Sequence, residues 1–261
     1  MVDVLGRLAE GPLFVVSVAV FLAIMELAYR LGRRRHPRTE EVVRSHILAL
    51  QGALIGLLSL LLGFNFAMAV ARFDVRKNLV QEEVGAITTA HLRAQLLPTR
   101  DRQEATELLK AYVAIRIEFM RALEDNTRIQ ATAAAAARVQ TQVWTLVERV
   151  VTQNPPFVVP FVQSMNDVIT VGDKRRAALD NHVPETVLHL LAGVALVTLG
   201  FIAYGYGLSG GPRHAASVIF ALLIAAVLTV IVDLDRPRSG FIRVGEDSMV
   251  RVQETLTRTG R

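Results

Sequence analysis

The segment GLLSLLLGFNFAMAVARFDVRKNLVQEE, residues 56–83, decides the fold, because it joins an apolar run to a charged run with no signal that ends a helix. Within this segment no charged residue precedes Arg72, and neither a proline nor a pair of glycines follows it. The sequence therefore predicts one helix from His46 to Leu97. At 1.5 Å per residue it would be about 75 Å long, enough to cross a bilayer and continue beyond it.

The composition is that of a membrane protein with a water-exposed part. Of the 261 residues 52% are hydrophobic, and the mean hydropathy is +0.37. The chain has no cysteine, which excludes disulfides, iron–sulfur clusters and thiol catalysis. The net charge of +5 comes from short arginine clusters, which indicate membrane orientation and not nucleic-acid binding.

Four stretches reach the roughly 20 apolar residues that a transmembrane helix needs. They are residues Pro12–Leu31, Ile47–Ala71, Val187–Tyr206 and Ala215–Val232. Three further blocks with helical periodicity lie between the second and third stretches, and no strand-like alternation appears. We therefore expect an all-α fold with four transmembrane helices and an extramembrane helical bundle inserted between the second and third.

This plan divides the chain into four parts. Residues 1–71 hold two transmembrane helices, 72–183 form the extramembrane helical domain, 184–234 hold two more transmembrane helices, and 235–261 are a polar tail. The loop of residues 32–46 carries five arginines. In a bacterial inner membrane it would face the cytoplasm, and the helical domain the periplasm. Basic residues from Arg72 to Lys77 and from Lys174 to Arg176 argue for the opposite orientation.

Polar residues inside the second stretch are the first candidates for function. Steps of seven from Gln51 reach Leu58, Asn65 and Arg72, which share one helix face with about 20° of drift per heptad. An amide at this depth either faces a water-filled path or bonds to a neighbouring helix. The large apolar side chains that recur every fourth residue either gate a pore by dewetting or form core. The candidates for lining or gating a path are Gln51, Leu60, Phe64, Asn65 and Met68.

Glycines and charges supply two further groups of candidates. Small residues let helices approach closely, so we expect Gly52, Gly56 and Gly63 to face a packed neighbour. Charged residues meet where the apolar stretches end, and they form either an ion-pair network or an ion-binding vestibule. This group contains Arg72, Asp74, Glu185, Asp233, Asp235 and Arg236. Two aspartates fall short of the six to eight oxygens that Ca²⁺ prefers.

The sequence gives no support for catalysis. It has no HExxH, and the phosphate-loop and GxSxG motifs need a preceding strand, which the sequence does not predict. Haem is excluded because only His189 lies inside an apolar stretch, and axial ligation across helices needs facing pairs. The sequence predicts that the protein is not an enzyme and has no catalytic residue, metal or cofactor.

Two stretches carry a family resemblance. Residues 51–98, QGALIGLLSLLLGFNFAMAVARFDVRKNLVQEEVGAITTAHLRAQLLP, and 233–244, DLDRPRSGFIRV, resemble the bacterial bestrophin-like membrane proteins, whose function is not settled. The resemblance implies four spans and a helical middle region, and a channel only by analogy. True bestrophins are pentameric anion channels whose second span lines an aromatic neck and whose termini are cytoplasmic. Here Phe64 and Phe66 are two residues apart and cannot share one helix face.

Two functions remain open at this point. The first is an oligomeric ion channel, by analogy an anion channel, whose second span lines the path, with lipid, other copies of the chain and small inorganic ions as partners. The second is a non-conducting sensor or scaffold whose helical domain binds a ligand or a partner protein. Nucleic acid is expected in neither case.

Overall fold

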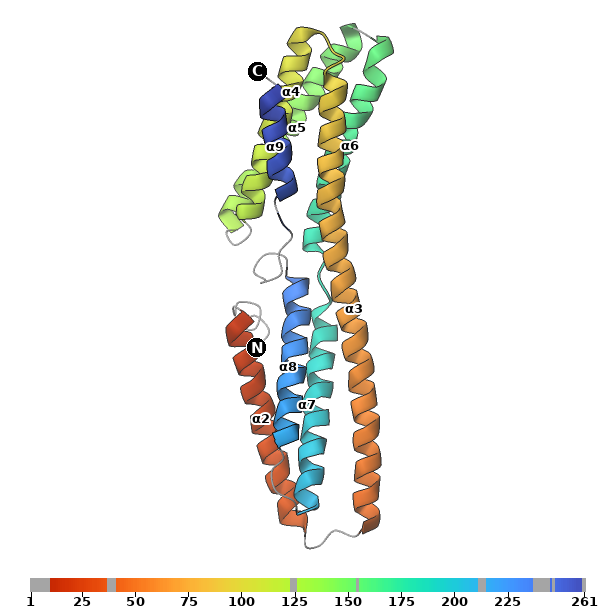
Figure 1. Cartoon of the computed structure of the whole chain (residues 1–261), viewed down its shortest axis with the longest axis vertical. Coiled ribbons are helices and arrows are strands. Elements are labelled where there is room, and N and C mark those ends of the chain that lie inside the picture. Colours follow the sequence, from red (N-terminus) through yellow and green to blue (C-terminus); the bar gives the residue numbers. More distant parts are fainter. Residues whose placement is uncertain are drawn as a thin grey trace. The chain divides into compact units, whose positions relative to one another are not determined.

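The structure is a computed structural model that describes residues 10–36, 41–122, 126–153, 155–210, 215–236, 245 and 247–259. All regular elements within these residues are helices, which confirms the all-α prediction. Residues 237–244, which carry most of the second stretch of family resemblance, lie outside the described residues. The helices in chain order are α2 (Glu10–Arg35), α3 (Glu41–Ala94), α4 (Thr99–Arg121), α5 (Asn126–Gln153), α6 (Pro155–Asp180), α7 (Glu185–Leu208), α8 (Ala215–Asp235) and α9 (Asp247–Thr259) (Figure 1).

Four helical runs among the described residues are long and apolar enough to cross a membrane. They are Gly11–Arg35, Glu41–Ala94, Val158–Leu208 and Ala215–Asp235. Each contains one predicted stretch. In the second run the uncharged part is 47–71, and in the third it is 186–208. The expected long helix is also confirmed, because α3 continues for 54 residues without interruption.

The chain divides into two compact units, and α3 contributes to both. We call residues Met1–Ala71 and His182–Arg236 the membrane unit, and residues Arg72–Asn181 and Pro237–Arg261 the helical unit. In the membrane unit α2, α7, α8 and the first part of α3 run along one another (Figure 1).

Glycines set the close approach of α2 and α7. A Cβ on Gly32 would touch Tyr204 O and lie 3.0 Å from Leu208 N. A Cβ on Gly207 would lie 2.8 Å from Arg33 N. The two backbones are therefore in direct contact at this point, and any side chain would separate them. Small residues serve this purpose in membrane helices, where dispersion contacts take the place of the hydrophobic effect.

Replacing Gly207 should separate α2 from α7. Because the obstacle is backbone and not a flexible side chain, we expect Gly207→Ala to cost about 1–3 kcal/mol of stability. Gly193→Ala on α7 is the matched control, since a Cβ there meets nothing within 4 Å among the described residues. Thermal unfolding of both variants in detergent measures the difference. Equal melting temperatures for the two variants would show that α2 and α7 do not meet through this glycine.

The helical unit is built on a continuous apolar core. The second part of α3 and helices α4, α5, α6 and α9 all contribute to it. Its buried members include Ile87, Leu109, Leu146, Phe161, Met165, Met249 and Leu256. The residues expected to form a polar tail thus include a helix, α9, whose Met249, Val252 and Leu256 enter the core. These three residues are spaced i, i+3, i+7, as on one face of a helix. The thirteen residues of α9 are mostly polar, so the composition of the segment does not reveal this apolar face.

A buried charge cluster joins three helices of the helical unit. Glu83 of α3 is fully buried, and its carboxylate lies 2.7 Å from Arg116 Nε of α4 and 2.5 Å from Arg175 Nη1 of α6. The Tyr112 hydroxyl donates to it at 2.7 Å. Burial alone raises the pKa of the Glu83 carboxyl, but the two guanidinium charges and the tyrosine outweigh burial and hold the pKa below its usual value.

Removal of the Glu83 charge should destabilise the helical unit. Glu83→Gln leaves Arg116 and Arg175 buried without a counter-charge, which costs about 3–5 kcal/mol. A carboxyl with a lowered pKa stabilises above its ordinary pKa of 4.5 and loses that contribution as the pH falls below it, so the variant should differ less from wild type in acid. Glu82→Gln, at an exposed neighbouring position, is the control. Denaturant titrations at pH 7 and in acid test both points, and a pH-independent difference contradicts the assignment.

Candidate functional site

One side of α3 in the membrane unit is uncovered. Leu60, Phe64 and Met68 follow one another at every fourth residue, and all three side chains are exposed, Phe64 by 64%. The sequence left open whether this row gates a path or forms core. The structure shows that the row is not core of a single chain. Its cover is lipid, water or another copy of the chain.

The predicted glycine face lies on this same uncovered side. Gly52, Gly56 and Gly63 are exposed, and a Cβ added to any of them meets nothing within 4 Å. The packed neighbour expected for these glycines is therefore not within the described chain. Gly32 and Gly207 do pack closely, and sequence reasoning missed both, because their partners lie far away in the sequence.

Asn65 and Gln51 point inward, away from the uncovered side. Asn65 is only 4% exposed, and its amide nitrogen donates to Leu61 O one turn earlier at 2.8 Å. Its Oδ1 is buried without a hydrogen-bond partner. Gln51 Nε2 donates to Phe201 O of α7 at 2.6 Å. The heptad correctly placed both amides on a shared side, but that side packs against the chain's own helices. A role of either amide in lining a path stays a prediction.

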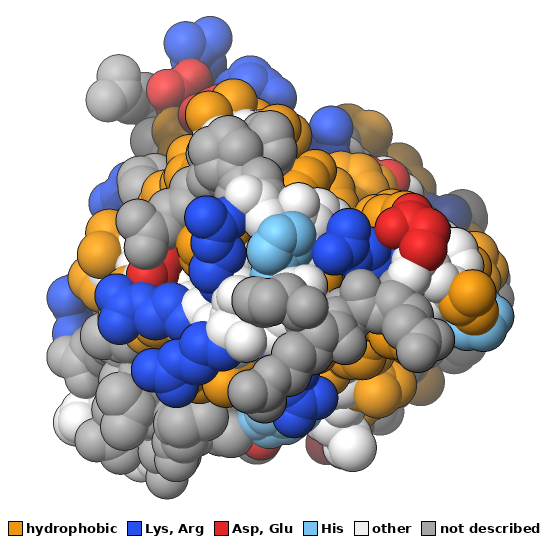
Figure 2. Space-filling model, turned by 90° about the horizontal axis from the view of Figure 1, so that it is seen from below, with side chains coloured by type: hydrophobic (Ala, Val, Ile, Leu, Met, Phe, Trp, Pro, Cys, Tyr) orange, Lys and Arg blue, Asp and Glu red, His pale blue; other side chains and the backbone are white. Residues whose placement is uncertain are grey.

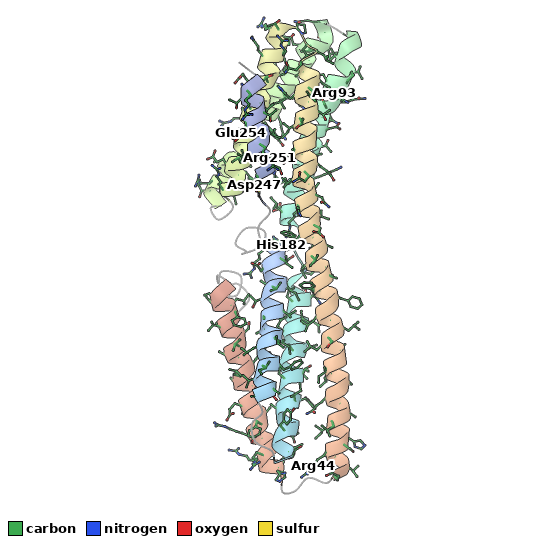
Figure 3. All side chains as sticks on the ribbon, in the orientation of Figure 1. Arg44, Arg93, His182, Asp247, Arg251 and Glu254 are labelled. Atoms are coloured by element: carbon green, nitrogen blue, oxygen red, sulfur yellow. The ribbon has the colours of Figure 1, made fainter. Side chains whose placement is uncertain are left out.

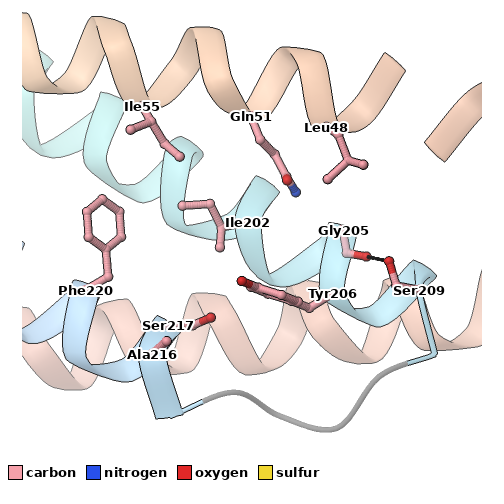
Figure 4. A pocket seen from close by; sticks show the side chains of 10 residues that line it. All are labelled: Leu48, Gln51, Ile55, Ile202, Gly205, Tyr206, Ser209, Ala216, Ser217 and Phe220. Atoms are coloured by element: carbon pink, nitrogen blue, oxygen red, sulfur yellow. Dashed lines mark hydrogen bonds between the residues drawn. The ribbon is translucent and has the colours of Figure 1, made fainter. Parts of the chain in front are cut away.

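Gln51 borders a pocket between α3, α7 and α8. Figure 4 shows its side chain pointing from α3 toward the polar groups of Tyr206 and Ser209 on α7. The cavity has a volume of about 320 Å³. On the α8 side lies Ser217, whose hydroxyl is buried and has no hydrogen-bond partner. The pocket was not predicted, because its residues come from three segments far apart in the sequence.

The predicted junction charges separate into two kinds. Asp233 and Asp235 at the end of α8 are buried, whereas Asp74 and Glu185 are exposed. Asp235 Oδ1 accepts from Val183 N at 2.8 Å, and its carbonyl lies 3.0 Å from the ring of His182, which is labelled in Figure 3. Asp235 thus holds the chain in place just before α7 begins.

Within the helical unit, two arginines of α3 donate hydrogen bonds to residues at the C-terminal end of α6. Arg72 donates to Asn181 Oδ1 at 3.0 Å. Arg76 is buried and donates to the carbonyls of Ala178 and Asn181 at 3.1 and 3.0 Å. An ion-pair network or an ion-binding vestibule formed by the six charged residues stays a prediction. Among the described residues no three His, Cys, Asp or Glu side chains lie together as a metal site would require.

The environment of Asn65 makes a prediction of its own. Asn65→Leu removes a buried carbonyl oxygen that has no partner, and such an oxygen costs about 1–3 kcal/mol. We expect the melting temperature of this variant to equal or exceed that of the wild type, and we expect the variant to assemble normally. Asn65→Ser keeps a polar group but leaves a void, and should be less stable than Asn65→Leu. A large loss of stability in Asn65→Leu would show that the amide makes a bond outside the single chain.

Comparison with known proteins adds family and fold. A family model described as Bestrophin-like domain matches residues 14–249. A variant of a bacterial Bestrophin homolog from Klebsiella pneumoniae is 13% identical, with a TM-score of 0.72 over 94% of this chain and 97% of that chain. Another crystal structure of a bacterial Bestrophin homolog from Klebsiella pneumoniae is 14% identical, with a TM-score of 0.68 over 95% and 97% of the two chains. No curated protein matches the chain.

Proposed function

Because this chain belongs to the bestrophin-like family of membrane proteins, we propose that copies of it assemble around an axis and that α3 lines an ion path there. The observation that carries the proposal is the uncovered side of α3, where Leu60, Phe64 and Met68 form a continuous exposed row. A ring of such side chains around an axis is a hydrophobic constriction, which gates ions by dewetting.

The glycines beside this row favour other copies of the chain over lipid as the cover. Lipid needs no small residues, whereas Gly52, Gly56 and Gly63 present bare backbone that a neighbouring helix can approach closely. A closed ring of identical chains would bury this surface in every copy. In each subunit the exposed row would then face the axis, and the three glycines would face the next chain.

Anions are the ions that this lining favours. Residues 47–71 carry no carboxylate, so the path has no fixed charge that attracts cations. The edge of an aromatic ring is electropositive, and Phe64 is the aromatic residue of the row. Phe66 is exposed as well but lies about 200° around the helix, so it belongs to another face.

The same proposal places the rest of the chain. The arginine-rich loop of residues 32–46 faces the cytoplasm of a bacterium, and the four helices cross its inner membrane. The helical domain at 72–183 is inserted between the second and third spans and lies on the periplasmic side. A helix that faces lipid would not carry charged residues such as Arg76, Lys77 and Glu82. These residues, together with the buried Glu83 cluster, support a water-exposed setting for this domain.

Ion flux through reconstituted protein tests the proposal. Phe64→Ala widens the constriction, and we expect chloride flux per assembled complex to rise several-fold. Ile219→Ala is the control, since Ile219 is a comparably exposed side chain on α8. Flux into liposomes and oligomer yield should be measured on the same preparations.

Three outcomes would count against parts of the proposal. Unchanged flux in Phe64→Ala with an intact oligomer removes Phe64 from the path. A flux of cations above chloride removes the anion assignment. No flux from wild-type oligomers favours the non-conducting sensor or scaffold.

A further inference from the structure

The pocket between α3, α7 and α8 lies close to one end of the membrane unit. On α3 its lining runs from Leu48 to Ile55, seven residues or about 10 Å along the helix. On α7 it ends at Ser209, which caps the helix, and on α8 it includes Ala216, the second residue of the helix. In a bilayer this depth is where the ester groups of a phospholipid meet its acyl chains.

Polar groups of the pocket are left without partners. Ser217 is 8% exposed, and its buried hydroxyl has no hydrogen-bond partner among the described residues. Gln51 uses its amide nitrogen on Phe201 O and has one more N–H to donate. A buried hydroxyl without a partner costs free energy, which a ligand with acceptor oxygens would recover.

Basic side chains lie at the same end of the membrane unit as the pocket. Figure 2 shows this end of the molecule, where Lys, Arg and His side chains gather on the surface. Arg44 lies one turn before Leu48 on α3, so it points along the same side as the lining. Figure 3 shows it at this end of the helix.

The guanidinium of Arg44 is loosely held. Its Nη1 lies 3.7 Å from the exposed carboxylate of Glu41, and its Nε is buried without a hydrogen-bond partner. Its Nη2 donates to His36 O at the long distance of 3.5 Å. The same Nη2 is 3.4 Å from His36 Nδ1, but that ring nitrogen lies 2.6 Å from Leu208 O. A ring nitrogen that donates to a carbonyl has no lone pair left to accept from arginine. Arg44 is therefore a partly buried cation that lacks a good anionic partner.

We propose that this pocket binds an anionic phospholipid from the adjoining leaflet. The phosphate pairs with Arg44, and the glycerol ester oxygens accept hydrogen bonds from Ser217 and Gln51. The first methylenes of the chains lie against the apolar part of the lining, and the rest of the lipid stays in the bilayer. The cavity of about 320 Å³ is large enough for the glycerol region and too small for a whole lipid. The site does not depend on whether the protein conducts ions.

Lipid binding to the purified protein tests this site. Dioleoylphosphatidylglycerol added to the protein in detergent should raise its melting temperature more than dioleoylphosphatidylcholine does, and native mass spectrometry should show one retained lipid per chain. We expect Arg44→Gln to weaken phosphatidylglycerol binding about ten-fold, the factor that corresponds to about 1.4 kcal/mol. Arg34→Gln, at an exposed position near the same end, is the control and should retain wild-type affinity.

A second pair of variants blocks the pocket without changing its charge. Ala216 lines the pocket and Ala215 does not, and both are exposed at the start of α8. Ala216→Trp should abolish retention of the lipid, and Ala215→Trp should not. Inorganic phosphate alone should give no shift in melting temperature. Equal stabilisation by the two lipids, equal losses in the two tryptophan variants, or a full shift with phosphate alone would each overturn the proposal.

Discussion

Helix α3 must serve two environments with one uninterrupted backbone, and the rest of the structure depends on this constraint. A helix satisfies its own backbone hydrogen bonds, so it can leave an apolar environment without a break. Only the side chains change, from the uncharged residues 47–71 to a charged sequence that begins at Arg72. One side of the helix stays buried along both parts, through Ala69, Arg76, Glu83 and Ala90 at a strict interval of seven. Within each unit, α3 is buried along one side only.

Hydropathy and length were enough to predict the four apolar runs, because an uncharged stretch of about 20 residues has few other stable structures. Helical periodicity predicted three helices between the second and third runs, but α9 was missed. They were not enough to predict which side of α3 is buried, since between residues 47 and 71 the helix is apolar all round. A polar stripe was the available signal, and it gave Asn65 a shared side with Gln51 but not the direction of that side. In the charged part of α3, hydrophobic periodicity would place charged residues at the surface, but Glu83 and Arg76 are buried.

Glycine shows the same limit. A GxxxG pair describes what one helix offers and says nothing about the helix that accepts it. Gly52 and Gly56 form such a pair and have no neighbour within 4 Å among the described residues, whereas Gly32 and Gly207 lie far apart in the sequence and bring two backbones into contact. The charge cluster is a further case: Glu83, Arg116 and Arg175 come from three helices, and no one of those segments predicts the others. Tertiary packing decides which of these residues are partners.

The two sides of α3 also connect the two proposals. The proposed path lies along the side with Leu60 and Phe64, and the proposed lipid site lies against the side with Gln51. Gln51 bonds to α7 across the pocket, so a lipid there is in contact with the hydrogen bond that holds the start of α3 to its neighbour. A ligand shifts a conformational equilibrium only by the difference in its affinity for the two states. An anionic lipid would therefore regulate the path only if the distance between α3 and α7 differs between open and closed states. A lipid that binds both states equally would stabilise the membrane unit and leave the flux unchanged.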